Sequence, residues 1–138
     1  MLRIAAAGAA CVAVGASLLM ATPAHADDDP PPPYVSHVEW AKWGDLSSLR
    51  VYPTAAGRSL AGDIGQRTAG EEAWGEVLAL SPDAAIPGMR EQFLCHWAFA
   101  ELVNPGKVSW NLEPWRPEVS EAEMYDANCN PGGTEEPF

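Results

Sequence analysis

Two histidines outside the N-terminal segment, His37 and His96, are the side chains best suited to acid–base chemistry in this sequence. Imidazole titrates near neutral pH, so either ring beside a carboxylate could act as the general base of a hydrolase. His96, however, falls in the middle of an apolar helical stripe, where a neutral core histidine is the more common finding. We therefore predict no catalytic residue. An envelope hydrolase that uses His96 or His37 with a carboxylate is the alternative.

A tight metal site needs three or four ligands, and the sequence offers only smaller sets. His37 and Glu39 share one face of a predicted strand, but no third ligand accompanies them. The segment 126–132 is similar to the first half of a calcium-binding loop, yet Pro131 stands where that loop requires glycine. The sequence predicts neither a metal ion nor a cofactor.

Cys95 and Cys129 are the two cysteines that remain if the N-terminal segment is removed as an export signal. Exported chains enter an oxidising compartment, where an even number of cysteines favours pairing. The sequence contains no Gly-x-Ser-x-Gly motif, which would indicate a serine nucleophile. We predict a disulfide bond between Cys95 and Cys129 that fastens the C-terminal segment to the core.

Six tryptophans raise the question of aromatic recognition. Trp43 borders a predicted turn and Trp115 follows a proline, so neither lies on a predicted buried face. Packing in the core explains these two tryptophans least well. An exposed pair would form a platform for a sugar or a peptide, with Asn111, Glu113 and Arg116 as polar neighbours. In the structural alternative, Trp115 closes the bottom of the core and Arg116 pairs with nearby glutamates. The remaining tryptophans lie on predicted buried faces: Trp40, Trp74, Trp97 and Trp110.

Alternating apolar and polar residues predict three strands, near 34–43, 48–53 and 107–113. A turn at 44–47 joins the first two strands as a hairpin, and prolines end the second and third. The order of strands and helices along the chain predicts an α+β fold with a small, mainly antiparallel sheet.

Two longer helices are predicted, at about 69–80 and about 87–103. Thr68 is expected to cap the first as part of a capping box. The second helix is apolar on nearly all sides, which is typical of a buried helix, so we place it at the centre of the core. Residues 54–66 are expected to form a loop with one helical turn, and a short last helix with a capping box starts at Ser120.

Met1–Ala26 has the features of an export signal. Arg3 supplies the positive end, a long apolar run follows, and residues 24–26 have the small-x-small pattern of a cleavage site. Cleavage there would make Asp27 the first residue. Lipid attachment at Cys11 is not expected, because the aliphatic residue that should precede it by three positions is missing.

The rest of the chain divides into an acidic, proline-rich leader at 27–33, a single globular domain at 34–130 and a flexible acidic tail at 131–138. The chain has 19 acidic and 8 basic residues, a net charge of −11, which disfavours nucleic acid and anionic lipid headgroups as partners. No second apolar run is long enough to span a membrane. We expect no membrane insertion after signal removal.

Four motifs occur in order along the chain: Ser48–Thr54 (SLRVYPT), Gln92–His96 (QFLCH), Trp110–Pro117 (WNLEPWRP) and Cys129–Pro131 (CNP). Together they resemble a small exported domain family of unknown function from actinobacteria, mycobacteria included. The resemblance implies export and a single domain, and it brings no catalytic residue with it. We predict a secreted or envelope-associated binding module whose partner is an envelope glycan, a peptide or a protein.

Overall fold

The structure is a computed structural model that describes residues 28–133. The predicted export signal, the first residue of the predicted leader and the last five residues of the predicted tail lie outside the described residues. The export signal and its cleavage site therefore stay predictions.

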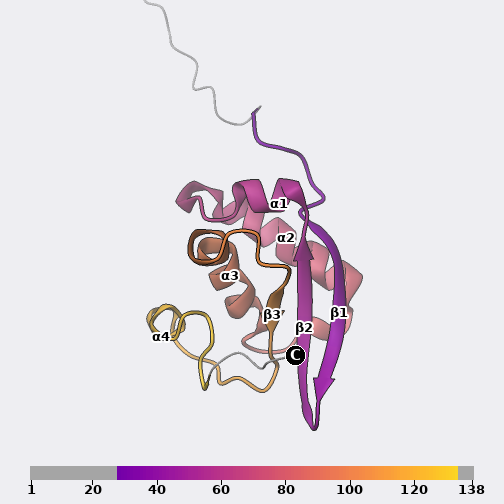
Figure 1. Ribbon diagram of the computed structural model, residues 1–138, viewed down its shortest axis with the longest axis vertical. Helices are drawn as coiled ribbons and strands as arrows, with labels where there is room; N and C mark the ends of the chain where they lie inside the picture. Colours follow the sequence, from indigo (N-terminus) through magenta and orange to yellow (C-terminus); the bar gives the residue numbers. More distant parts are fainter. Residues whose placement is uncertain (1–27, 134–138) are drawn as a thin grey trace, which may run out of the picture.

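A three-stranded antiparallel sheet forms one side of the molecule, with the strands in the order β1, β2, β3 (Figure 1). Leu49 of the central strand pairs with Trp40 on one side and with Leu112 on the other, and it is fully buried. The predicted α+β fold with an antiparallel sheet is confirmed. The strands are β1 Val35–Trp43, β2 Leu46–Pro53 and β3 Trp110–Leu112.

The longer helices of the described range, α2 and α3, pack against each other and against the sheet, with α2 next to β1 and α3 next to β3. Figure 1 shows α4 beside α3, and the predicted capping box of Ser120 and Glu123 is present at its start. None of these helices has the length and apolar character needed to cross a bilayer. The helical elements are α1 Ala55–Leu60, η1 Ile64–Gln66, α2 Arg67–Leu80, η2 Pro82–Ala84, α3 Met89–Val103 and α4 Glu121–Asp126.

Aromatic side chains from α2, α3 and β3 fill the core. The rings of Trp97 and Trp110 meet edge to face with their centroids 6.1 Å apart, and Phe93 lies 6.0 Å from Trp110. Trp74 adds a further contact, 5.7 Å from Phe93. Aromatic pairs in these geometries stabilise a core beyond the area they bury. Three of the four tryptophans predicted to be buried are so, and Trp40 is half-buried at the edge of the core.

Two helix starts differ from the predicted ones for local reasons. Helix α3 begins at Met89 and not at Pro87, because Gly88 has a left-handed φ of 86° that an α-helix cannot include. Thr68 is not the N-cap of α2, because the 3-10 turn η1 leads directly into a helix that begins at Arg67.

Strand β3 is shorter than predicted and begins at Trp110. The guanidinium of Arg58 donates to the backbone oxygens of Lys107 at 2.6 Å and Val108 at 3.2 Å. These carbonyls therefore bind a side chain and not a neighbouring strand. Arg58 lies on α1, a helix capped by Thr54 where we predicted a loop with one helical turn.

The helix predicted to be buried at about 87–103 packs in the core, but its last turns are exposed. Leu102 is 63% exposed and Val103 is 80% exposed, and Phe99 is also at the surface. A helix of 15 residues is about 22 Å long, whereas the three residues of β3 extend only about 10 Å. Strand β3, which lies next to α3, is therefore too short to cover the C-terminal end of this helix.

Glu76 on α2 fixes the point at which the chain enters the sheet. One of its carboxylate oxygens accepts hydrogen bonds from the backbone N–H groups of Tyr34 at 2.8 Å and Val35 at 2.7 Å. Figure 1 shows the chain entering β1 at the upper end of the molecule, whereas α4 lies in its lower half. The start of the domain is thus anchored far from α4.

Gly57 on α1 packs directly on the backbone, since an added Cβ would lie 2.3 Å from the carbonyl oxygen of Tyr34. Gly57→Ala is expected to destabilise the protein by about 1–3 kcal/mol through overpacking, although alanine favours a helix. The matched control is Gly75→Ala on α2, where no atom lies within 4 Å of the added Cβ. That change should stabilise by about 0.5–1 kcal/mol. Urea unfolding measures both, and equal effects of the two changes would contradict the close packing at Gly57.

Candidate functional site

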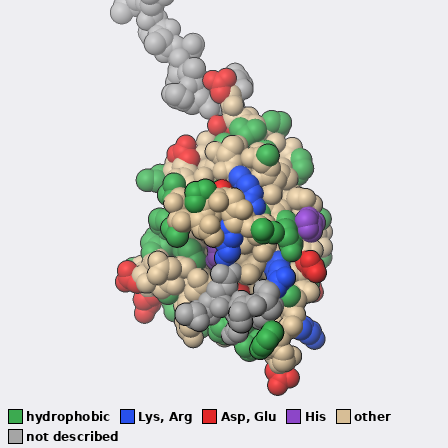
Figure 2. Space-filling view, viewed as in Figure 1, with side chains coloured by type: hydrophobic (Ala, Val, Ile, Leu, Met, Phe, Trp, Pro, Cys, Tyr) green, Lys and Arg blue, Asp and Glu red, His purple; other side chains and the backbone are tan. Residues whose placement is uncertain are grey.

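A groove open to solvent lies between the exposed end of α3 and the segment around α4. Its volume is about 460 Å³, in the range of small-molecule sites, and its lining is mostly apolar. Figure 2 shows hydrophobic side chains gathered above the place that α4 has in Figure 1. We name this hollow the α3–α4 groove. Its lining residues are His96, Phe99, Ala100, Val103, Asn104, Lys107, Tyr125, Asn128, Cys129 and Asn130.

One wall of the groove is a single face of α3. His96, Phe99, Ala100 and Val103 follow the i, i+3, i+4, i+7 spacing that places side chains on one helix face. This face extends for about 10 Å along the helix axis. The ring of Tyr125 meets Phe99 edge to face with the centroids 5.0 Å apart, so an aromatic pair closes one side.

Tyr125 contributes a neutral ring to the groove. Its hydroxyl donates a hydrogen bond to the carboxylate of Glu121, one helical turn earlier. This bond raises the pKa of Tyr125 and lowers the pKa of Glu121. The tyrosine therefore stays protonated at physiological pH and adds an apolar surface with one polar edge.

His96 lies at the inner end of the α3 wall and is only 6% exposed. Its Nδ1–H donates to the backbone oxygen of Gln92 at 2.8 Å. Because a carbonyl oxygen can only accept, this contact places a proton on Nδ1 and orients the ring. The partner of Nδ1 is thus a backbone carbonyl, whereas a catalytic dyad would place a carboxylate there. Such burial is what we expect of a core histidine.

Lys107 is the one residue with a full charge among the described residues that line the groove, and none of these is acidic. The backbone at Lys107 is held by Arg58, which also pairs with Glu101. Glu101 in turn accepts from the N–H of Gly106 at 3.0 Å, so the loop that carries the lysine is well anchored.

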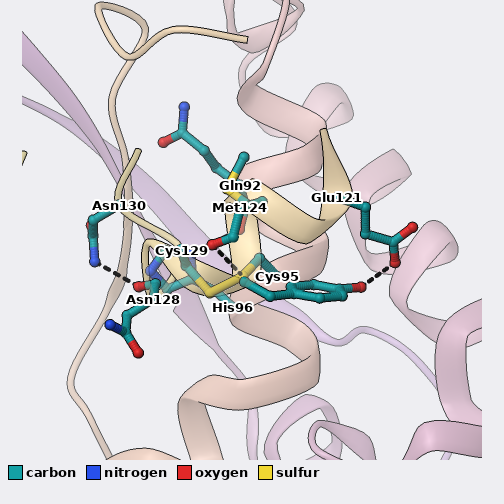
Figure 3. The surroundings of a disulfide bond; sticks show 9 residues. Gln92, Cys95, His96, Glu121, Met124, Asn128, Cys129 and Asn130 are labelled. Atoms are coloured by element: carbon teal, nitrogen blue, oxygen red, sulfur yellow. Dashed lines mark hydrogen bonds between the residues drawn. A yellow bond between two sulfur atoms is a disulfide. The ribbon is translucent and has the colours of Figure 1, made fainter. Parts of the chain in front are cut away.

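A disulfide bond holds the second wall of the groove on α3. The Sγ atoms of Cys95 and Cys129 are 2.06 Å apart, which confirms the predicted pairing. Figure 3 shows the bond with His96 beside it and with Asn128 and Asn130 on the segment that follows α4. Asn128 and Cys129 have positive φ values of 50° and 65°. This left-handed turn brings the chain back to the helix.

The five residues predicted to form an aromatic platform differ in exposure. Trp43, next to the hairpin turn, is 56% exposed, whereas Asn111, Glu113 and Arg116 are buried. Trp115 is half-buried, and the guanidinium of Arg116 lies 4.5 Å from the centre of its ring. The burial of the three polar residues favours the structural alternative, and a role of the five in binding stays a prediction.

Glu113 and Arg116 form a buried ion pair at the end of β3. Their side chains are 1% and 0% exposed, and Nε of Arg116 lies 2.6 Å from a carboxylate oxygen. The other carboxylate oxygen accepts from Ser48 Oγ at 3.1 Å, while Arg116 donates to the backbone oxygen of Pro131 at 3.1 Å. The side-chain amide of Gln92 bonds both backbone groups of Glu113, at 2.9 and 3.0 Å. This network ties β2, β3, α3 and the C-terminal segment together.

His37 and Glu39 lie exposed on the β1–β2 hairpin. The ring of His37 stacks on Tyr52 with centroids 4.1 Å apart, and the Tyr52 hydroxyl donates to Glu39 at 3.4 Å. Among residues 28–133, no group of three or more His, Cys, Asp or Glu side chains is arranged to hold a metal ion. The histidine and the carboxylate are thus linked through a tyrosine on an open strand surface.

The site prediction from sequence does not include Phe99, Val103, Lys107 or Tyr125. The signal that could have found the first two is the 87–103 helix itself, which is apolar on nearly all sides. Such a helix needs cover on all sides, and the predicted sheet is too small to supply it. Lys107 and Tyr125 line the groove because segments distant in the sequence meet in the fold. No local sequence pattern indicates such contacts.

Residues 35–132 match the family described as "Protein of unknown function (DUF2599)". The chain belongs to this family. Its relatives include the uncharacterized proteins Rv0477 of Mycobacterium tuberculosis and Mb0487 of Mycobacterium bovis, each 57% identical over 107 residues, which are 78% of this chain and 72% of the relative. The uncharacterized protein ML2452 of Mycobacterium leprae is 49% identical over 105 residues, 75% of this chain and 83% of that protein. The predicted resemblance is confirmed, and no solved structure matches the DUF2599 chain significantly.

Proposed function

We propose that this DUF2599 protein is an exported, non-catalytic binding module whose ligand site is the α3–α4 groove. The observation that carries the proposal is the uncovered apolar end of α3, where Phe99 and Val103 line a hollow of about 460 Å³. Contiguous apolar surface on a small protein commonly marks a binding site. Its partner would be a molecule of the cell envelope or the medium.

Two features support export. The N-terminal segment has the pattern of a cleavable signal, and the two cysteines of the domain are paired with each other. Disulfides of this kind form outside the reducing cytosol. We place the protein in the cell envelope or the surrounding medium.

The surroundings of the histidines favour binding over hydrolysis. The hydrolase alternative needs a histidine, a carboxylate and a cavity at one place. His96 faces the groove but donates to a backbone carbonyl, whereas His37 is linked to Glu39 through Tyr52 on the open sheet surface. Ester and glycoside hydrolysis assays on the purified protein test the alternative, in which His96 or His37 serves a hydrolase.

A ligand screen followed by ¹H–¹⁵N NMR tests the groove. Short oligosaccharides, peptides and acyl compounds serve as probes, and at least one class should shift the amide signals of Phe99, Val103 and Asn128. Val103→Glu should remove this response. Val108→Glu is the matched control, because Val108 is 74% exposed, close to the 80% of Val103, and does not line the groove. Shifts confined to Trp43 would assign binding to the hairpin, and no response at all would overturn the proposal.

Mass spectrometry of the protein from culture supernatant tests export. We expect an intact mass that corresponds to a chain beginning at Asp27, because the small-x-small pattern at 24–26 is followed by an acidic, proline-rich leader. A secreted species that retains Met1–Ala26, or one that carries lipid on Cys11, would contradict the cleavage site.

A further inference from the structure

We infer that the α3–α4 groove binds one linear alkyl chain and recognises the chain, not a charged headgroup. The inference rests on the proposed function and names the ligand class for the same groove. Three features carry it: the continuous apolar wall on α3, the use of the hydrogen-bond donors of the lining within the protein, and a buried acceptor without a partner.

The apolar wall suits an extended chain. The face formed by His96, Phe99, Ala100 and Val103 continues along α3 for about 10 Å, and the ring of Tyr125 borders it. Three of these side chains, Phe99, Val103 and Tyr125, are exposed to solvent. An alkyl chain that lies along the wall removes this surface from water, one methylene after another. Each buried methylene strengthens binding up to about 4-fold.

The side-chain donors of the lining are used within the protein. The hydroxyl of Tyr125 donates to Glu121, and Nδ1–H of His96 donates to a backbone oxygen one helical turn earlier. Nδ2 of Asn130 donates to the backbone oxygen of Asn128 at 2.8 Å. The described lining residues include no serine, threonine or arginine. A ligand rich in acceptors, such as a sugar, therefore finds few donors in this groove.

The backbone N–H groups of the lining are used as well. Within α3 and α4 they take part in helical hydrogen bonds. Outside the helices they donate to other backbone oxygens at 2.8–3.1 Å, at Asn104, Lys107, Asn128, Cys129 and Asn130. An extended peptide gains much of its affinity from hydrogen bonds between main chains. Since the described lining residues have no backbone donor left for such bonds, a peptide strand is disfavoured.

Asn130 disfavours a carboxylate on the second wall. Its Oδ1 is buried and has no hydrogen-bond partner among residues 28–133. The bond from Nδ2 to a carbonyl identifies the two amide atoms, because a carbonyl oxygen can only accept. An anionic headgroup would bring further acceptors to this acceptor, on a chain whose net charge is already −11. The alkyl chain must therefore supply the affinity.

Isothermal titration calorimetry with 1-octanol, 1-hexanol and octanoate tests the ligand class. 1-Octanol should bind saturably and about 10-fold more tightly than 1-hexanol, which lacks two methylenes. Octanoate has the same number of carbons and should bind no more tightly than 1-octanol. Val103→Glu should weaken 1-octanol by about 10-fold or more, because it places a carboxylate on the apolar wall. Val108→Glu, outside the groove, is the matched control and should leave the affinity unchanged.

The outcomes separate this inference from the proposed function. Equal affinity for 1-hexanol and 1-octanol, or tighter binding of octanoate than of 1-octanol, overturns recognition by the chain. Groove amide signals that respond to a sugar or a peptide but not to 1-octanol overturn the ligand class and leave the groove as a binding site. Octanol binding that survives Val103→Glu places the ligand elsewhere and overturns the inference.

Flotation with phosphatidylcholine vesicles distinguishes a single chain in solution from a bilayer. A hollow of about 460 Å³ suits one chain, so the protein should not float with the vesicles. Flotation that Val103→Glu abolishes would assign the groove to a membrane surface and overturn the inference. Self-association in sedimentation that 1-octanol does not reverse would assign the groove to a second copy of the chain and overturn it too.

Discussion

Replacing Glu113 by alanine is expected to lower the free energy of unfolding by about 3–5 kcal/mol. The change leaves the guanidinium of Arg116 buried without the carboxylate that lies 2.6 Å from it, and it also removes the acceptor of Ser48. Removal of one partner of a buried ion pair is among the most destabilising changes that a small domain can undergo. Urea unfolding followed by tryptophan fluorescence gives the value.

A surface ion pair provides the control for this experiment. Arg67 and Glu121 lie 3.4 Å apart with both side chains 61% exposed, so solvent screens their attraction. Arg67→Gln should leave the unfolding midpoint nearly unchanged. If Glu113→Ala proved as mild as Arg67→Gln, the network at the end of β3 would not contribute to stability as the structure indicates.

Loss of the Cys95–Cys129 bond is expected to cost about 3–4 kcal/mol, because the bond closes a loop with a sequence separation of 34 residues. In a domain of this size such a loss lowers the melting temperature by roughly 12 °C or more. The double variant Cys95→Ser, Cys129→Ser tests the effect in a thermal melt. The C-terminal segment should be the part most affected, since α4 adds mainly Met124 to the buried cluster around the bond.

Chemical reduction of the unmodified protein distinguishes the effect of losing the disulfide bond from the effect of the two substitutions. Dithiothreitol should lower the melting temperature about as much as the double variant, and it should have no effect on that variant. Thiol labelling of denatured, unreduced protein should find no reactive cysteine. Two reactive thiols in protein from an oxidising compartment would contradict the pairing.

The elements of the fold could be predicted because each has a local signal. The hairpin follows from two alternating runs, α2 and α3 from their apolar period, and α4 from the capping box at Ser120. The errors occur where distant residues decide the outcome. Strand β3 begins late because Arg58, 49 residues earlier in the sequence, binds the carbonyl of Lys107. Nothing near Lys107 in the sequence indicates this contact.

The candidate site was less predictable than the fold. Pairing of Cys95 with Cys129 follows from their number and the predicted export, and burial of His96 follows from its place in an apolar stripe. The groove depends on a mismatch of lengths between α3 and its neighbour β3, so it needs the assembled structure. The polar residues near Trp115 look like a recognition surface in the sequence, whereas in the fold Glu113 and Arg116 bind each other.

The hydrogen bonds from Tyr34 and Val35 to Glu76 determine where a force applied through the leader acts on the domain. Because this carboxylate holds the backbone of Tyr34 and Val35, a load or a tether attached before β1 acts on the end of the domain away from α4. Attachment through the other terminus would act on the segment around Pro131, whose carbonyl Arg116 holds, and would strain a wall of the groove itself.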